Sequence, residues 1–194
     1  MQELLTARGG RVLLDRSDIQ QVLRQMADAI LALSWPDDDH LPEAERPRPW
    51  LIGIHRGGVP VAEELADILS LSEGWRPLVG SIDVTMYRDD TWLKGPAASE
   101  GRTNLPGDPT GQRVVLIDDV LHTGRTIRAA LNVLVDFGRP EAVRLGVLVD
   151  RGERELPIAA DVVGQAIQVA RNESVQLACD AAGSLARVIV MPRG

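Results

Sequence analysis

The sequence predicts an α/β fold with a mostly parallel, twisted sheet and helices on both of its faces. Short aliphatic runs are typical of buried strands, and segments with apolar residues at helical spacing are typical of amphipathic helices. The two kinds of segment alternate along most of the chain, which is the pattern of parallel sheets with crossover helices. Because ligands of such sheets bind at the carboxyl ends of the strands, we expect the functional residues there.

The first half of the chain predicts two helices and a strand between them. A helix is expected to begin near Ser17, with apolar side chains at helical spacing from Ile19 to Leu33. Residues 34–49 are rich in proline and charge and are expected to form a surface loop. The elements that follow are a buried strand at 50–54, a turn at 55–58 and a helix at 59–70.

The second half predicts more strands, one helix and a small β hood. Its expected elements are strands at 77–87, 113–117 and 142–150, and a helix from Thr126 to Phe137 that ends at Gly138. Residues 88–112 form a long polar stretch rich in Gly and Pro, and a loop of this length is usually functional or disordered. Three short terminal strands, with the sequences DVVG, SVQLA and ARVIVM, are expected to supply the hood.

The composition is that of one globular domain, residues 1–194. Of these residues 44 % are hydrophobic and only 3 % are aromatic, so the core is expected to be aliphatic. The net charge of −7 disfavours general nucleic-acid binding, which depends on clustered Lys and Arg. The single cysteine, Cys179, allows no disulfide within the chain and favours a cytoplasmic location. No signal-peptide pattern and no apolar run of ~20 residues is present, so no membrane partner is expected.

Two adjacent carboxylates, Asp118 and Asp119, follow a run of aliphatic residues and precede a short turn. In that turn Thr123 and Thr126 add hydroxyls, and Gly124 allows the backbone to curl before a helix begins. Such a turn can bind phosphate through its N–H groups and the positive end of the helix dipole. An acid pair at this place can simply cap the helix. Beside a phosphate, the pair makes sense only if the ligand also offers hydroxyls or carries a metal, and ribose 5-phosphate offers hydroxyls.

Other nucleotide-binding and metal-binding motifs are absent from the sequence. There is no G-x-x-x-x-G-K-[ST] motif of a P-loop, and no G-x-G-x-x-G motif follows a strand. The three histidines, His40, His55 and His122, lack the spacing of a zinc site. These absences leave the acid pair and its turn as the main candidate site.

The segment VVLIDDVLHTGRT, residues 114–126, resembles the motif that binds phosphoribosyl pyrophosphate (PRPP) in type I phosphoribosyltransferases. Three further segments resemble the PyrR family, whose members are pyrimidine-operon regulators and also uracil phosphoribosyltransferases. These segments are DVTMYRDD at 83–90, LVDFGRP at 134–140 and VLVDRGERELPIAADVVG at 147–164. The resemblance runs from about Ile19 to Leu177 and covers most of the chain.

This resemblance implies conversion of uracil and PRPP to UMP and pyrophosphate, with Mg²⁺ as cofactor. PRPP oxygens and water would bind most of the Mg²⁺, so no protein metal site is expected. The implied catalytic residues are Asp118, Asp119 and Arg88, and the two aspartates would hold the ribose hydroxyls. The implied PRPP-binding residues are His55, Arg56, Gly57, Asp118, Asp119, Val120, Leu121, His122, Thr123, Gly124, Arg125 and Thr126. The implied base-binding residues are Asp150, Arg151 and Val163.

Two loops are matched to family loops by the same resemblance. The HRGG turn at 55–58 stands where the pyrophosphate loop is expected, but Arg56 comes one place earlier than in the usual Thr-Arg-Gly sequence. The 88–112 loop corresponds to a flexible lid that closes over the site and excludes water, with Tyr87 and Arg88 at its hinge. A plain strand-to-helix turn and a disordered surface loop are the alternative interpretations.

Regulatory members of the family bind a messenger-RNA leader and respond to uridine nucleotides. Asp28, Ala159 and Gln165 stand where such members typically carry His or a basic residue, which weakens the prediction of RNA binding. Four arginines could still form a local patch of positive charge, namely Arg11, Arg16, Arg24 and Arg171.

Three hypotheses about function follow. The first is a uracil phosphoribosyltransferase that also regulates a pyrimidine operon through its mRNA leader. The second is an RNA-binding attenuator with weak or no catalysis. The third is a purine phosphoribosyltransferase, which is disfavoured because the one Phe and the one Tyr lie away from the expected base site. By analogy with the family, a homodimer or a larger homo-oligomer is expected.

Overall fold

The computed structural model of the chain describes residues 9–36, 38–40, 42, 45–85 and 103–193. A five-stranded sheet in the order β3-β2-β4-β5-β6 forms its centre, and every neighbouring pair of strands is parallel. The strands are β2 (Trp50–Ile54), β3 (Val79–Ile82), β4 (Arg113–Leu121), β5 (Ala142–Asp150) and β6 (Val162–Ala166). The predicted parallel α/β sheet is therefore confirmed.

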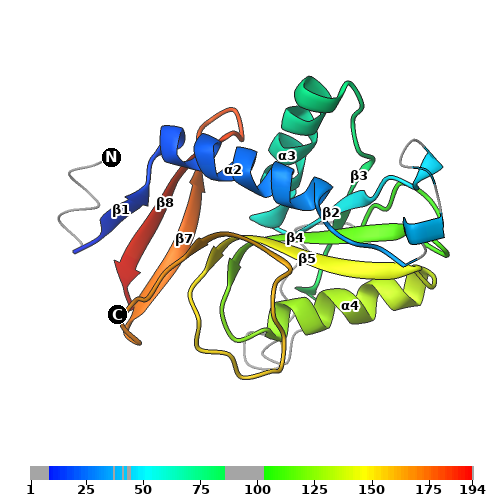
Figure 1. The fold of residues 1–194 in the computed structure, drawn as a ribbon. Coiled ribbons are helices and arrows are strands. Elements are labelled where there is room, and N and C mark those ends of the chain that lie inside the picture. The colour runs from blue at the N-terminus through cyan, green and yellow to red at the C-terminus, as the bar shows by residue number, and fades with distance from the viewer. Residues whose placement is uncertain (1–8, 37, 41, 43–44, 86–102, 194) are drawn as a thin grey trace.

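Helices cover both faces of this sheet, as the sequence predicts. Helices α2 (Arg16–Leu31) and α3 (Gly58–Glu73) lie on the upper face in Figure 1, and α4 (Arg125–Phe137) lies on the lower face. Two aliphatic clusters result, one between the sheet and α2 with α3, the other between the sheet and α4. Along β4, Val115 and Ile117 join the first cluster while Val114 and Leu116 join the second, because side chains alternate between the faces of a strand.

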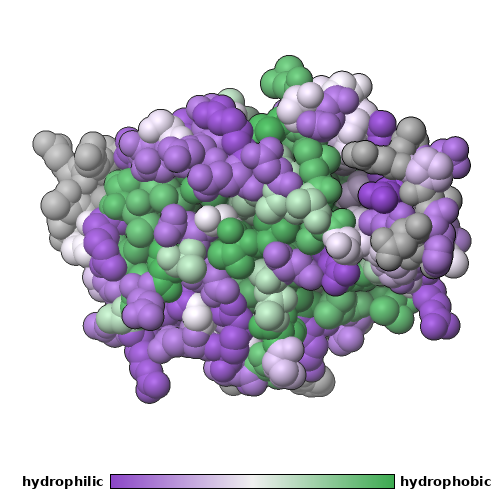
Figure 2. All heavy atoms as spheres, viewed as in Figure 1, coloured by the Kyte–Doolittle hydropathy of each residue, from purple (hydrophilic) through white to green (hydrophobic). Residues whose placement is uncertain are grey.

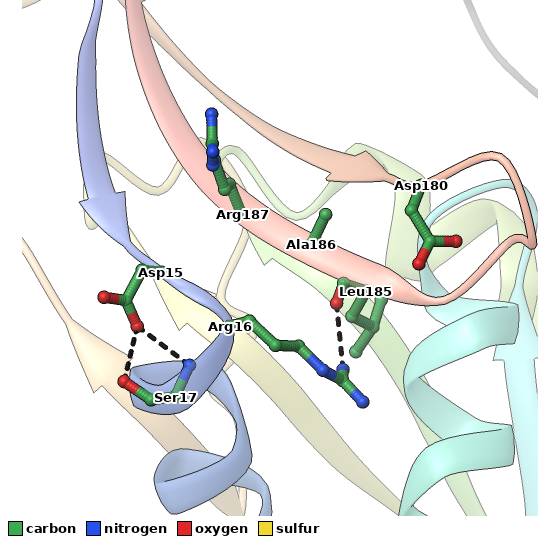
Figure 3. A pocket seen from close by; sticks show the side chains of 7 residues that line it. All are labelled: Asp15, Arg16, Ser17, Asp180, Leu185, Ala186 and Arg187. Atoms are coloured by element: carbon green, nitrogen blue, oxygen red, sulfur yellow. Dashed lines mark hydrogen bonds between the residues drawn. The ribbon is translucent and has the colours of Figure 1, made fainter. Parts of the chain in front are cut away.

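A second, antiparallel sheet forms the hood at the end of the molecule where both termini lie (Figure 1). It consists of β1 (Arg11–Leu14), β8 (Leu185–Pro192) and β7 (Glu173–Cys179), in that order. Arg16 attaches it to the helices, since its guanidinium donates to the Leu185 carbonyl at 2.9 Å and to the Glu64 carboxylate. Figure 3 shows Arg16 pointing to this carbonyl, in a hollow that is also lined by residues of β8.

Several elements differ from the sequence predictions. The strand expected at 77–87 is limited to β3, and the helix expected at 59–70 continues to Glu73. The cap of α2 is Asp15 and not Ser17, because the Asp15 carboxylate accepts the N–H groups of Ser17 and Asp18 in a capping box. Strand β4 continues to Leu121, so the acid pair lies within the strand and not after it. The DVVG segment adds β6 to the main sheet instead of the hood, and β1 completes the hood although the sequence did not predict it.

The predicted lid at 88–112 falls mostly outside the described residues. Its last part, from Thr103 onward, packs against the sheet: Asn104 exchanges two backbone hydrogen bonds of 2.8 Å with Ser81, next to the end of β3. The short helical turn η1 (Asp38–His40) interrupts the predicted 34–49 loop. Figure 2 shows hydrophilic residues along the outward side of α2. Within the described ranges, no helix is long and apolar enough to cross a membrane.

Candidate active site

The acid pair lies at the carboxyl end of β4, the central strand of the sheet. Asp118 is only 5 % exposed, and one oxygen of its carboxylate accepts the N–H of Asp119 at 3.0 Å. Asp119 is half-buried. Because neighbouring parallel strands end at the same edge, the loops after β2 and β5 surround this pair.

The glycine turn after β2 comes into direct contact with the acid pair. A Cβ atom added to Gly57 would lie 2.2 Å from Oδ2 of Asp119, and one added to Gly58 would lie 2.1 Å from the Ile117 carbonyl oxygen. Side chains at these two positions would collide with β4, so the approach depends on glycine. The peptide bond between His55 and Arg56 is cis. The turn expected to bind pyrophosphate therefore lies beside the acid pair.

The start of α4 is built as an open helix N-terminus. Gly124 takes the N-cap position with φ of +90°, a left-handed conformation that glycine adopts without strain, and it has no side chain that could cap the helix. The Thr123 hydroxyl accepts the Arg125 N–H, at a distance of 3.4 Å. The α2 terminus is different, because the Asp15 carboxylate occupies it. The first N–H groups of an α-helix have no partner within the helix, and together with the helix dipole they can bind an anion. The α4 terminus is therefore suited to a phosphate.

The side chains of the turn before α4 have varied surroundings. Leu121 is buried in the α4 core cluster, and Val120 packs against the other cluster, so only their backbones can contact a ligand. Nε2 of His122 lies 3.5 Å from the Glu153 carboxylate. Burial, together with the nearby positive charge of Arg151, lowers the pKa of His122, although Glu153 opposes the shift. The imidazole is therefore mostly neutral at pH 7. Arg125 is half-exposed and pairs with Glu155 at 2.7 Å.

A cavity of about 590 Å³ opens beside these groups, at the ends of β5 and β6. Residues 150–153 and 166–169 line it. Asp150 is one of these lining residues. Burial raises the pKa of its carboxyl, but hydrogen bonds from Arg154 and the Gly152 N–H outweigh burial and hold the pKa below its ordinary value. Asp150 is thus a carboxylate at pH 7 in the lining of this cavity.

The other predicted site residues are placed as follows. Arg151 is buried, and its guanidinium donates to the Glu173 carbonyl at 3.0 Å in the hood. Val163 pairs with Val147 in the sheet, farther from the site edge than Asp150, and is 40 % exposed. Among the described residues, His55 Nε2 is buried without a hydrogen-bond partner. Arg56 is exposed, and Arg88 lies outside the described residues.

One residue that the sequence analysis did not single out, Arg154, lies at the centre of the site's framework. Its guanidinium donates to the carbonyl oxygens of His122 (2.8 Å) and Ile158 (3.1 Å) and to the Asp150 carboxylate. Arg154 belongs to the 147–164 segment that carries the family resemblance, but its own signal is only that of a basic residue four places after the acid that ends a strand. That spacing has no meaning outside a helix, so it attracted no prediction.

The edge of the sheet thus places carboxylates, which can accept hydroxyl hydrogens, beside N–H groups that can bind a phosphate. A ligand that needs both is a ribose phosphate, and with this sheet topology the arrangement is typical of the phosphoribosyltransferase class. Comparisons with known proteins agree, since residues 18–182 match the model of the phosphoribosyl transferase domain.

Relatives at higher similarity are named bifunctional protein PyrR. One from Herpetosiphon aurantiacus is 57 % identical over 128 residues, which cover 66 % of this chain and 71 % of the relative. Another, from a Geobacter species, is 42 % identical over 179 residues, which cover 92 % of this chain and 96 % of the relative. The chain therefore belongs to the phosphoribosyltransferase family and, within it, to the PyrR family.

Solved structures confirm the fold. The hypoxanthine phosphoribosyltransferase of Trypanosoma cruzi has a TM-score of 0.67 at 19 % identity, over 94 % of this chain and 96 % of that chain. The enzyme from Leishmania tarentolae, solved with GMP, has a TM-score of 0.66 at 17 % identity over 95 % and 97 % of the two chains. At these identities the likeness concerns the fold and not the base that each protein uses.

Proposed function

We propose that this protein transfers the phosphoribosyl group of PRPP to uracil and releases pyrophosphate. The observation that carries the proposal is the contact of three segments at one sheet edge: the acid pair of β4, the glycine turn at 57–58 and the open N-terminus of α4. In the proposed reaction N1 of uracil bonds to C1 of the ribose while the bond from C1 to pyrophosphate breaks, and the N1 proton is lost. The protein has to hold three charged or polar parts of PRPP in one orientation.

Each part of PRPP has a matching group in the chain. Asp118 and Asp119 would accept hydrogen bonds from the ribose hydroxyls, and the N–H groups from Thr123 to Thr126 would bind the 5′-phosphate. The 55–58 turn, with the imidazole of His55 and the guanidinium of Arg56, would bind pyrophosphate. The positive charge that builds on the ribose as pyrophosphate leaves would be stabilised by the two aspartates.

Magnesium fits this site as a cofactor that brings most of its own ligands. Carboxylate oxygens such as those of Asp118 and Asp119 are donors that Mg²⁺ prefers, and Gly57 approaches the Asp119 carboxylate with its backbone alone, without a side chain between them. Among the described residues, no group of three or more His, Cys, Asp or Glu could hold a metal alone. When bound with PRPP, Mg²⁺ would neutralise charge on the leaving pyrophosphate.

Uracil is the base that the cavity supports best. Purine sites usually stack an aromatic side chain on the base, and the residues that line this cavity, Asp150–Glu153 and Ala166–Val169, include none. Phe137 is 52 % exposed at the far end of α4. A small pyrimidine that is recognised through the backbone of these two segments therefore suits the cavity better than a purine.

The test is a comparison of bases with purified protein, PRPP and Mg²⁺. Uracil, hypoxanthine and guanine are supplied separately, and nucleoside monophosphates are separated by chromatography. We expect UMP from uracil and no product from either purine. IMP or GMP as the main product would overturn the uracil assignment, and no product from any base would overturn the proposed catalysis.

A second activity, binding of an mRNA leader, is favoured by the name of the relatives, bifunctional protein PyrR. The chain itself supports it less well, because Asp28, Ala159 and Gln165 are exposed and none of them is basic. Binding to a leader RNA should weaken steeply with salt if phosphate contacts carry it. A titration of the RNA of the chain's own pyrimidine operon at two salt concentrations tests this, and equal affinity for an unrelated RNA of the same length would contradict it.

A further inference from the structure

Arg154 connects the two halves of the proposed site without facing a ligand itself. Its side chain is 22 % exposed and contacts the 122–124 turn through a hydrogen bond to the His122 carbonyl. The left-handed conformations of Gly152 (φ +72°) and Glu153 (φ +55°) reverse the chain just before it. Arg154 thus extends from the base side of the site to the phosphate side.

The guanidinium of Arg154 is occupied by protein acceptors from three segments. Nε donates to the Ile158 carbonyl at 3.1 Å, and Nη1 donates to the carbonyls of His122 at 2.8 Å and Gly152 at 3.0 Å. Nη2 donates to the Asp150 carboxylate. A planar fork of five N–H donors can satisfy acceptors in several directions at once, whereas a lysine ammonium has three donors at one point.

The carbonyls held in this way determine where the next N–H groups point. In a trans peptide the C=O and the following N–H point in opposite directions, and the peptides of this turn are trans. Arg154 holds the His122 carbonyl, so the Thr123 N–H is directed away from Arg154. The Thr123 carbonyl accepts the N–H groups of Glu155 and Leu156 at 3.0 and 3.1 Å, so the Gly124 N–H is directed the same way. Two successive N–H groups that point to one side form a concave anion site.

We propose that Arg154 is a positioning residue for the 5′-phosphate: by holding the His122 carbonyl it aims the Thr123 N–H, in line with that of Gly124, at the phosphate. This inference rests on the proposed function and assigns Arg154 no contact with substrate. Replacement of Arg154 should weaken the binding of every ligand that carries a ribose 5-phosphate. It should leave pyrophosphate binding at the 55–58 turn unchanged, because no hydrogen bond of Arg154 extends to that turn.

The experiment compares two inhibitors, ribose 5-phosphate and pyrophosphate, in the wild type, Arg154→Ala and Arg154→Lys. We expect the inhibition constant for ribose 5-phosphate and the KM for PRPP to rise about tenfold or more in both variants, from the loss of charge-assisted hydrogen bonds. The inhibition constant for pyrophosphate should stay within about twofold, and methylguanidinium at millimolar concentration should restore ribose 5-phosphate binding to Arg154→Ala but not to Arg154→Lys.

The matched control is Arg76→Ala, which also removes an arginine with two carboxylate partners, Glu63 and Asp67, at the opposite edge of the sheet. It should change neither constant. Equal weakening of both inhibitors in Arg154→Lys, or no weakening of ribose 5-phosphate, would overturn the positioning role. If the wild type makes no UMP, the proposed function fails on its own. Calorimetric titration of ribose 5-phosphate into the same variants still tests Arg154, and an affinity unchanged from wild type overturns its role.

Discussion

Strand β4 carries a buried charge near each end, and the two ends are built differently. At the amino end Arg113 is 2 % exposed, and at the carboxyl end Asp118 is 5 % exposed. Arg113 donates to the Asp38 carboxylate and to the Pro36 carbonyl, both at 2.7 Å, and lies over the Trp35 ring. Asp118 is approached instead by the backbone of the glycine turn at 57–58.

This difference separates a structural charge, Arg113, from a candidate ligand-binding charge, Asp118. The Trp35 ring lies over Arg113, and the hydrogen bonds of Arg113 attach Pro36 and Asp38 to β4. Gly57 and Gly58 instead pack against Asp118 and Asp119 with their backbones, so no side chain of this turn comes between it and the acid pair. Asp118 also has a partner in the chain, the Asp119 N–H, but it lies where the carboxyl ends of parallel strands meet, and this position makes it a candidate for ligand binding.

The largest expected effect is at the carboxyl end. Replacement of both aspartates, Asp118→Asn with Asp119→Asn, keeps the side-chain shape but removes two charged hydrogen-bond acceptors. We expect UMP formation to fall by about a thousandfold or more, since each such bond contributes roughly 1.5–3 kcal/mol. The melting temperature should change little. Activity within tenfold of wild type would show that the pair does not hold the ribose.

Replacement of Arg113, at the amino end of β4, should lower stability instead of activity. Arg113→Met keeps most of the apolar volume but removes the donor of the Pro36 carbonyl and the closest positive charge of Asp38, which keeps, among the described residues, only the Trp35 N–H and the more distant Arg46. Removal of one partner of a buried ion pair is strongly destabilising, and we expect the melting temperature to drop by about 10 °C. Calorimetry measures this, and KM values at a temperature well below the transition should match those of wild type. A large change in KM would contradict the assignment of Arg113 to structure.

A smaller effect on activity is expected where the glycine turn at 57–58 contacts the acid pair. Gly57→Ala places a Cβ that the Asp119 carboxylate must move to avoid. We expect kcat/KM to fall by about tenfold to a hundredfold, because ligand geometry is sensitive to displacements of about 1 Å. The control is Gly74→Ala, since an added Cβ there meets nothing within 4 Å. That variant should lose some stability from its φ of +69° and keep full activity.

The smallest expected effect is a dependence of stability on pH. Burial raises the pKa of Asp38, but hydrogen bonds from Arg113 and the Trp35 N–H outweigh it and hold the pKa below its ordinary value. A carboxyl with a lowered pKa in the folded state stabilises the protein above its unfolded pKa, and this contribution is lost as the pH falls through the folded value. The gap in melting temperature between wild type and Arg113→Met should therefore narrow between about pH 5 and pH 3. A gap that stays constant over this range would contradict the ion pair.

Much of the fold could be predicted because local sequence patterns determine where most strands and helices form. The aliphatic runs at 50–54 and 142–150 became β2 and β5 with the same boundaries. Other boundaries were wrong where a distant partner decides them. Strand β4 extends through the acid pair because β5 pairs with it as far as Leu121. The DVVG segment joins the main sheet because it forms β6, which pairs with the other side of β5.

The same distinction applies to the site. The acid pair, Gly124 and the 55–58 turn were expected from their own residues, since each has a local signature. Arg154 was not, because its role depends on the carbonyl of His122, 32 residues away in sequence. The contact of Gly57 with Asp119 also joins residues that only the sheet brings together.

By itself the sequence determined the alternation of strands and helices, the aliphatic core and the identity of the charged and glycine-rich turns. Hydrophobic spacing and glycine chemistry act over a few residues, so they can be read directly from the chain. Only the tertiary structure decided which turns meet at one edge, which charges are enclosed by partners, and which carbonyls a guanidinium holds. Those outcomes depend on strand order and on side-chain packing between segments far apart in sequence, and no local pattern specifies them.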